Sequence, residues 1–186
     1  MRWLRARGQE RRTATRLYGS VVAQARDAAF YANYGVPDTL EGRFGLLTVH
    51  LYLVLERLKG EGETGAALSR SLVETFITDM DDSMRELGVG DLSVPRKVKK
   101  AAAALYDCIH ECRAAMAAAD SDLLVETLTR SVYGSIAVAE SSAFGPEAIA
   151  AYMGKAATAL AAQAAADVLA GRIVFPPASS GMGEER

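Results

Sequence analysis

The stretch DMDDSMRELGVGDLSVPRKVKK, residues 79–100, concentrates charges of opposite sign on the two sides of a glycine-containing break. The acidic group, near the end of one predicted helix, comprises Asp79, Asp81, Asp82 and Glu86. The basic group, in the first turns of the next predicted helix, comprises Arg96, Lys97, Lys99 and Lys100. Both groups oppose the helix dipole, at a cost of roughly 0.3–1 kcal/mol per charge at low salt. Such a conflict between local rule and fold is typical of a functional or specificity feature.

Outward from this junction, apolar residues recur every three or four positions along most of the chain, which is typical of amphipathic helices. We expect helices over about 14–33, 39–58, 66–87, 93–118, 120–142 and 146–170, and no strand. Short connections favour antiparallel neighbours, so the second and third helices should form a hairpin. The sequence therefore predicts an all-α fold, a compact single-domain bundle of about six helices.

The composition is that of a globular protein of 186 residues, half of them apolar and a quarter charged. We expect a basic N-terminal segment at residues 1–13, a helical domain at 14–171 and a flexible tail at 172–186. The tail is rich in Pro, Gly and Ser. A net charge of −2 gives no overall attraction to nucleic acid, and we expect no DNA partner.

No stretch of the sequence is long and apolar enough to predict a membrane span or a secretory signal. We expect a bacterial cytoplasmic protein that works at the periphery of the inner membrane. The alternative is the mitochondrial matrix, because the arginine-rich N-terminus is also typical of a mitochondrial presequence.

Four segments contain residues that could carry chemistry, and none has the required pattern. A calcium loop beginning at Asp79 would need Gly and Glu where Met84 and Gly90 stand. Cys108 and Cys112 share a helix face, but a four-ligand zinc set is not evident, so core cysteines are preferred. His50 lacks any accompanying nucleophile motif, and Gly88-Val89-Gly90 is too short for a phosphate loop. We therefore expect no catalytic residue, metal or cofactor.

The basic N-terminus has two interpretations. It is either a solvated, frayed helix end or a surface that contacts a ribosome or an anionic membrane. The basic group at residues 96–100 either adds to such a surface or pairs with the acidic group across the turn, and the pairing is favoured. We also predict an ion pair between Arg43 and Asp79 or Asp82, because the expected hairpin brings their helices together.

Two blocks of sequence resemble a known family. The first comprises Ala25-Arg26, Phe30-Tyr31, Gly35-Val36-Pro37-Asp38-Thr39, Gly42-Arg43-Phe44, Leu47 and His50; the second comprises Asp79-Met80-Asp81, Arg85-Glu86-Leu87-Gly88-Val89-Gly90-Asp91 and Val98-Lys99. Together, over about residues 17–133, they resemble the ubiquinol–cytochrome c chaperone family. The resemblance implies an all-α, non-catalytic assembly factor for the cytochrome bc1 complex. Mitochondrial members bind newly made cytochrome b near the ribosomal exit.

The resulting hypothesis is a chaperone whose partner is cytochrome b or another respiratory-complex subunit. An apolar groove with Met80, Met84, Met116 and Met153 would hold the client. The candidate structural or interaction residues are Arg43, Phe44, His50, Asp79, Asp81, Asp82, Arg85, Glu86 and Asp91. The candidate basic surface comprises Arg2, Arg5, Arg7, Arg11, Arg12, Arg96, Lys97, Lys99 and Lys100. The alternative is a helical carrier of an apolar small molecule such as quinone or lipid, which requires a closed apolar cavity.

Overall fold

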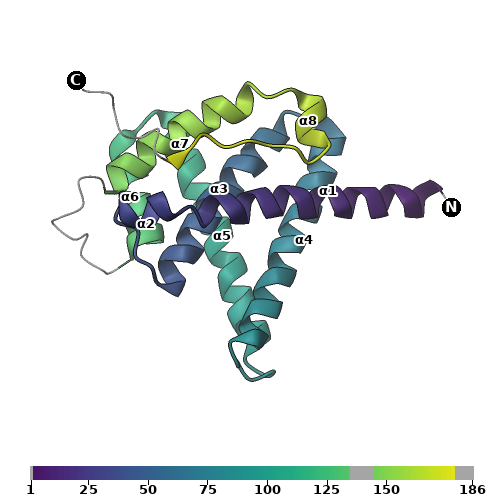
Figure 1. The fold of residues 1–186 in the computed structure, drawn as a ribbon, viewed down its shortest axis with the longest axis horizontal. Coiled ribbons are helices and arrows are strands. Elements are labelled where there is room, and N and C mark those ends of the chain that lie inside the picture. The colour runs from purple at the N-terminus through teal and green to yellow at the C-terminus, as the bar shows by residue number, and fades with distance from the viewer. Residues whose placement is uncertain (1, 135–144, 179–186) are drawn as a thin grey trace.

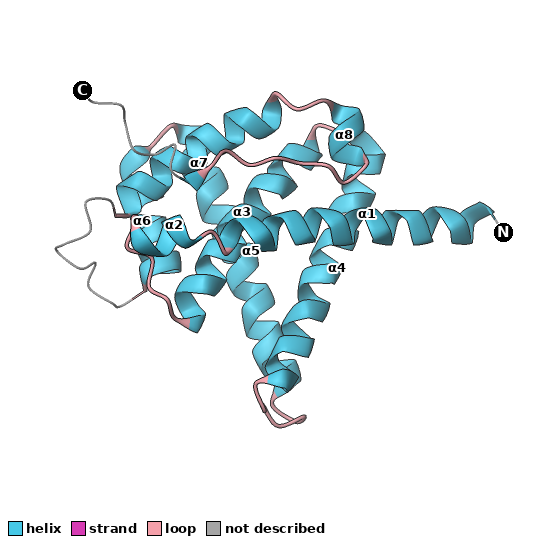
Figure 2. Cartoon of the chain, in the orientation of Figure 1, coloured by secondary structure: helices cyan, strands magenta, loops and turns pink. Residues whose placement is uncertain are grey.

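The structure, a computed structural model, describes residues 2–134 and 145–178, with side chains from residue 7 onward. Every regular element in these ranges is a helix, which confirms the all-α prediction (Figures 1 and 2). The helices are α1 (Arg2–Ala25), α2 (Ala28–Ala32), α3 (Leu40–Lys59), α4 (Gly62–Glu86), α5 (Val94–Ala118), α6 (Ser121–Leu128), the π-helix η1 (Thr129–Tyr133), α7 (Pro146–Ala161) and α8 (Ala165–Leu169). No helix in the described ranges is both long and apolar enough to cross a membrane.

Helix α3 is the centre of the bundle and contacts α1, α4, α5, α7 and η1. Every residue from Gly45 to Leu55 is buried, so the helix is covered on all sides rather than along one stripe. The sequence explains this burial, because Leu46, Val49 and Val54 are apolar as well as the leucines Leu47, Leu51 and Leu55, which recur every four positions. A rigid, enclosed helix of this kind is a firm support for side chains at its exposed first turn.

Helix α1 begins earlier and ends earlier than expected. Residues 2–13 of the predicted basic segment form the first half of the helix, and Figure 1 shows the start of α1 projecting beyond the rest of the bundle. The helix stops at Ala25 because Asp27 starts a new one. The Asp27 side chain accepts a hydrogen bond from the Ala29 amide at 2.9 Å and so caps α2.

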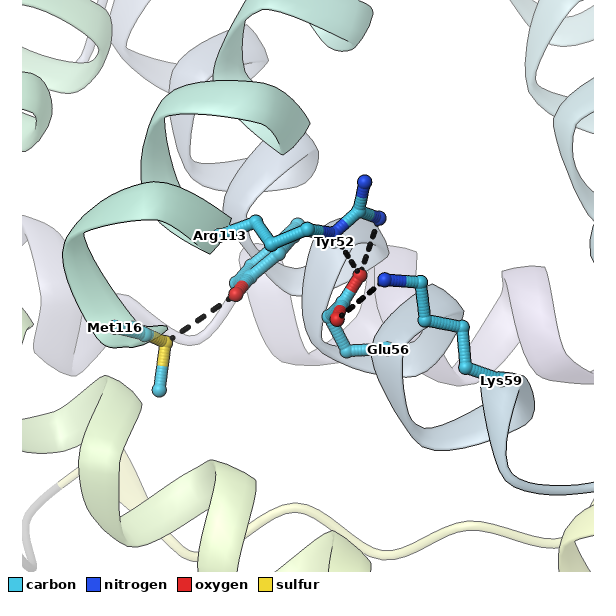
Figure 3. Close-up of polar contacts among 5 residues, drawn as sticks. All are labelled: Tyr52, Glu56, Lys59, Arg113 and Met116. Atoms are coloured by element: carbon cyan, nitrogen blue, oxygen red, sulfur yellow. Dashed lines mark hydrogen bonds and ion pairs between the residues drawn. The ribbon is translucent and has the colours of Figure 1, made fainter. Parts of the chain in front are cut away.

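Helices α4 and α5 form a long hairpin whose turn lies far from the core (Figure 1). Gly88 makes the turn with a φ of +76°, a conformation that favours glycine. The hairpin is held on α3 by Arg113 of α5, whose Nε lies 2.9 Å from Glu56. Lys59 reaches the other oxygen of Glu56 at 3.2 Å (Figure 3). Beside this pair the Tyr52 hydroxyl donates to the sulfur of Met116 at 3.4 Å.

The last predicted helix is divided, and the chain then turns back across the bundle. Residues 171–178 run along α7 toward α1 and α2, the yellow segment of Figure 1. Ile173, Phe175 and Ala178 are buried, and the Gln163 side chain bonds both the amide and the carbonyl of Val174, at 3.0 and 2.7 Å. The prediction of a flexible tail from residue 172 is therefore wrong for 172–178. Residues 179–186 lie outside the described residues.

Candidate functional site

A groove of about 220 Å³ opens where α1, α2, α3 and α4 meet. Its apolar part comes from Val22, Leu40, Phe44, Leu47 and Met80. Its polar part comes from Arg26, Tyr31, Arg43, Asp79 and Ser83. Both sequence blocks that carry the family resemblance contribute side chains, although they lie on different helices. The groove is therefore the candidate site.

The apolar floor is firm because the aromatic ring of Phe44 packs on the fully buried Phe76 of α4, with ring centroids 6.1 Å apart. Leu40 lies at the mouth of the groove with 65% of its surface exposed. A partner that covered Leu40 would remove this surface from water.

The rim of the groove is organised around Arg43. Its Nε donates to Asp38 at 2.6 Å, and its guanidinium carbon lies 6.0 Å from the centre of the Tyr31 ring. The hydrogen bond from Arg43 lowers the pKa of the Asp38 carboxyl. Gly42 makes this arrangement possible, because a Cβ there would lie 2.2 Å from the carbonyl oxygen of Pro37. The turn can thus lie directly on the start of α3, with Asp38 within reach of Arg43.

The predicted ion pair between Arg43 and Asp79 or Asp82 is wrong. Arg43 and Asp79 do line the same groove, as the predicted hairpin implied. However, Arg43 is paired with Asp38, and Asp79 accepts a hydrogen bond from the Tyr18 hydroxyl at 2.7 Å. Burial, followed by the bond to Asp79, raises the pKa of Tyr18 far above its usual value. Sequence periodicity could not reveal this partner, because Tyr18 lies 61 residues away on α1.

At the turn between α4 and α5, acidic side chains form ion pairs with Arg85 rather than with the basic group at residues 96–100. Arg85 bonds Asp81 through Nε and Asp91 through Nη1, each at 2.6 Å. Arg96, Lys97, Lys99 and Lys100 are exposed, and within the described ranges none of them has an ion pair. The favoured prediction that they neutralise the acidic group across the turn is therefore wrong. Asp82 and Glu86 are also exposed. Asp82 lies beside the groove, and Glu86 lies beside the turn.

The two parts of the candidate basic surface lie at different ends of the molecule. Figure 1 shows the start of α1 at one extremity and the start of α5 at the hairpin turn. The side chains of Arg7, Arg11 and Arg12 are exposed along α1, whereas those of Arg2 and Arg5 lie outside the described residues. The second basic group therefore does not extend the first, and the role of each stays a prediction.

His50 is a buried structural residue. Its Nδ1 donates to the Leu46 carbonyl at 2.8 Å, so its Nε2 accepts from the Tyr152 hydroxyl at 3.0 Å. Tyr152 in turn accepts from Gln24 at 3.1 Å. The ring edges of Phe30 and Phe175 complete an aromatic box around the imidazole. Complete burial lowers the pKa of His50 to about 4.

The remaining candidates lie inside the fold. The sulfurs of Cys108 and Cys112 are 3.8 Å apart, and both thiols are free and buried. Of the four methionines expected in a groove, Met80 lines it and Met84 does not. Met153 is fully buried, and the sulfur of the half-buried Met116 accepts a hydrogen bond from Tyr52. The groove is open and bears Arg26, Arg43 and Asp79, so it differs from the closed apolar cavity that a quinone or lipid carrier requires.

Comparisons with known proteins give a consistent result. A family model described as ubiquinol-cytochrome C chaperone matches residues 32–175. The crystal structure of the Cbp3 homolog from Brucella abortus superposes with a TM-score of 0.81 at 32% identity, over 95% of this chain and 96% of that one.

Curated relatives match over shorter stretches. Ubiquinol-cytochrome c reductase complex assembly factor 1 of Mus musculus is 32% identical over 76 residues, 41% of this chain and 26% of that protein. The Xenopus laevis protein of that name is 24% identical over 96 residues, 52% of this chain and 48% of its own length. The match thus spans no more than about half the length of these relatives.

Proposed function

The chain belongs to the ubiquinol–cytochrome c chaperone family, and we propose that it is a non-catalytic chaperone that binds newly made cytochrome b during assembly of the cytochrome bc1 complex. The curated relatives are named as assembly factors of ubiquinol-cytochrome c reductase, and these names support a role for this chain in assembly of that complex. The observation that carries the proposal is the groove itself. Residues that make the chain resemble the family converge on it from four helices, α1 to α4.

The shape of the groove suits one or two apolar side chains of a partner. At about 220 Å³ it is smaller than the pockets that enclose drug-sized ligands, which begin near 300 Å³. An amphipathic or transmembrane helix of the client would lay an apolar anchor onto Phe44 and Met80 and cover Leu40. This is the helix-in-groove mode of recognition.

The rim would set the orientation of the client. Arg43 is held by Asp38 and Tyr31, so its guanidinium is positioned before binding and loses little further freedom. Asp79 is held by Tyr18 on the opposite side. A client with a carboxylate or backbone carbonyl near Arg43 and a donor near Asp79 would satisfy both sides.

Binding rather than catalysis accounts for the ionisable groups around the groove. Asp79 already accepts from Tyr18, and Arg43 is already paired with Asp38. His50 is enclosed, with both ring nitrogens bonded. These groups serve to hold the groove and the core in place.

The place of action is part of the proposal. We propose that the protein works on the cytoplasmic side of the bacterial inner membrane, where a newly made membrane subunit becomes available. The projecting basic half of α1 would contact the ribosome or anionic lipid.

Copurification in mild detergent, followed by mass spectrometry, tests the client. The wild-type chain should retain cytochrome b, and Leu40→Asp should lose it, because a charge at the exposed mouth opposes an apolar anchor. The matched control is Leu123→Asp, a 40% exposed leucine on α6 outside the groove. Deletion of the gene should lower cytochrome bc1 content. Unchanged bc1 content would reject the proposal.

A further inference from the structure

The turn between α4 and α5 exposes apolar surface that no described part of the chain covers. Leu92 is 100% exposed and Leu87 is 64% exposed. Both lie at the tip of the hairpin, far from the core (Figure 1). Gly88 and Gly90 have open space where a Cβ would stand, so no described side chain packs against these two positions of the turn. Exposed leucines gathered at a projecting turn mark a contact surface.

The tip also carries positive charges that form no ion pair among the described residues. The basic group at residues 96–100 begins four residues after Leu92, in the first turns of α5. Its side chains are exposed and unpaired within the described ranges. Bases at the positive end of a helix destabilise it, so stability does not explain them.

Some carboxylates near the tip are neutralised by ion pairs, and the others lie on a different face of the hairpin from the bases. Arg85 holds Asp81 and Asp91 in ion pairs. Asp82 and Glu86 share a face of α4 with Asp79, and Asp79 lies against α1 through Tyr18. The uncompensated acids therefore belong to the α1 side of the hairpin, whereas the bases belong to α5.

We propose that this tip docks on an anionic membrane surface. Leu87 and Leu92 enter the headgroup boundary, and the basic group at residues 96–100 binds lipid phosphates. Exposed leucines beside Lys and Arg are the chemistry of reversible interfacial binding. Two leucines cannot anchor the chain permanently, so binding would be weak and sensitive to salt. This inference assigns the membrane contact to the hairpin tip rather than to α1, and it does not depend on the identity of the client.

Flotation with vesicles tests the proposal on the full chain. Phosphatidylcholine vesicles are compared with vesicles containing roughly equal parts of phosphatidylcholine and phosphatidylglycerol. The wild type should float with the anionic vesicles only, and added salt should release it. The double variants Leu87→Ser/Leu92→Ser and Lys97→Glu/Lys100→Glu should each lower the bound fraction about tenfold. Their melting temperatures should not fall below that of the wild type, because all four side chains are exposed and acids suit the start of a helix better than bases.

Control variants separate the tip from the rest of the surface. Val174→Ser removes an apolar side chain that is 73% exposed elsewhere, and Arg70→Glu reverses an exposed charge elsewhere on α4, so both should float like the wild type. If the wild-type protein does not float with anionic vesicles, the proposal is overturned, even if the tip binds an acidic protein. Tip variants that float normally, while Arg11→Glu/Arg12→Glu does not, would overturn it by assigning the contact to α1. Retention of cytochrome b is measured separately, so the two proposals fail independently.

Discussion

The hydroxyl of Tyr18 on α1 donates a hydrogen bond to Oδ2 of Asp79 on α4, at 2.7 Å. The same two helices are joined again by the bond from Ser71 to Glu10. Asp79 lines the groove, so the hydrogen bond from Tyr18 fixes the position of a carboxylate at the rim of the groove. It also explains how an acid near the C-terminal end of α4 is accommodated, because the carboxylate has a fixed donor.

Tyr18→Phe should destabilise the fold by about 1 kcal/mol, because a buried hydroxyl–carboxylate bond is lost. Denaturant unfolding measures the change, and a double-mutant cycle with Asp79→Ala isolates the pair. Tyr106→Phe is the control, because this tyrosine on α5 is 57% exposed, and it should leave stability unchanged. A coupling energy near zero would contradict the role given to the Tyr18–Asp79 bond.

Arg43→Ala should weaken client binding without lowering the melting temperature. The side chains of Arg43 and its partner Asp38 are 60% and 62% exposed. Exposed ion pairs of this kind contribute little to stability. Thermal melts and copurification of cytochrome b are measured on the same preparations. Arg85→Ala is the matched control, since it also breaks exposed ion pairs but lies outside the groove. A fall in melting temperature for Arg43→Ala alone would make that residue structural.

Periodicity was sufficient for the helical class and for the α3–α4 hairpin, because burial of one face repeats every three or four residues. It could not identify the break at Asp27, where a capping side chain ends one helix and begins another. It also could not show that residues 172–178 are packed. Phe175 is buried against His50, a contact between segments more than a hundred residues apart.

Of the nine candidate interaction residues named from the sequence, Arg43, Phe44 and Asp79 line the groove. The lining does not include the other six: His50, Asp81, Asp82, Arg85, Glu86 and Asp91. Charge and the expected hairpin suggested that Arg43 pairs with Asp79 or Asp82, whereas the Pro37–Asp38 turn supplies the acid that it does pair with. That pairing depends on the missing side chain of Gly42, which no charge pattern records.

Gly42→Ala should destabilise the fold by about 1–3 kcal/mol, the usual cost of forcing extra volume into a packed place. A Cβ would lie 2.2 Å from the backbone oxygen of Pro37, so the turn must move away and take Asp38 with it. Gly19→Ala is the control, because no described atom lies within 4 Å of its Cβ position in the middle of α1. There the alanine should stabilise by about 0.5–1 kcal/mol. Equal effects at both sites would contradict the close approach.

Phe175→Ala should destabilise the fold by about 3–5 kcal/mol, as large-to-small changes of buried aromatics do. The ring is 8% exposed and stands 5.2 Å, centre to centre, from the imidazole of His50. Val174→Ala, at the exposed neighbouring position, should change stability far less. Chemical denaturation compares the two. If Phe175→Ala unfolds like the wild type, residues 172–178 behave as the free tail that their composition suggested.

His50 should make folding stability fall as the pH is lowered from about 6.5 to about 4. Above pH 6.5 the imidazole is neutral in both the folded and the unfolded chain, so it adds no pH dependence. Between the two values the unfolded chain binds the proton and the buried imidazole does not, which costs the folded state roughly 3 kcal/mol in total. Below about pH 4 both states are protonated and the loss is complete.

The measurement is urea unfolding at a series of pH values, on the wild type and on His50→Gln. The glutamine amide oxygen can accept from Tyr152 but does not titrate, so the slope over this interval should shrink in the variant. The carboxyl groups titrate in both chains, and the difference between the two curves removes their contribution. Identical slopes in the wild type and His50→Gln would mean that the imidazole accepts its proton inside the folded bundle.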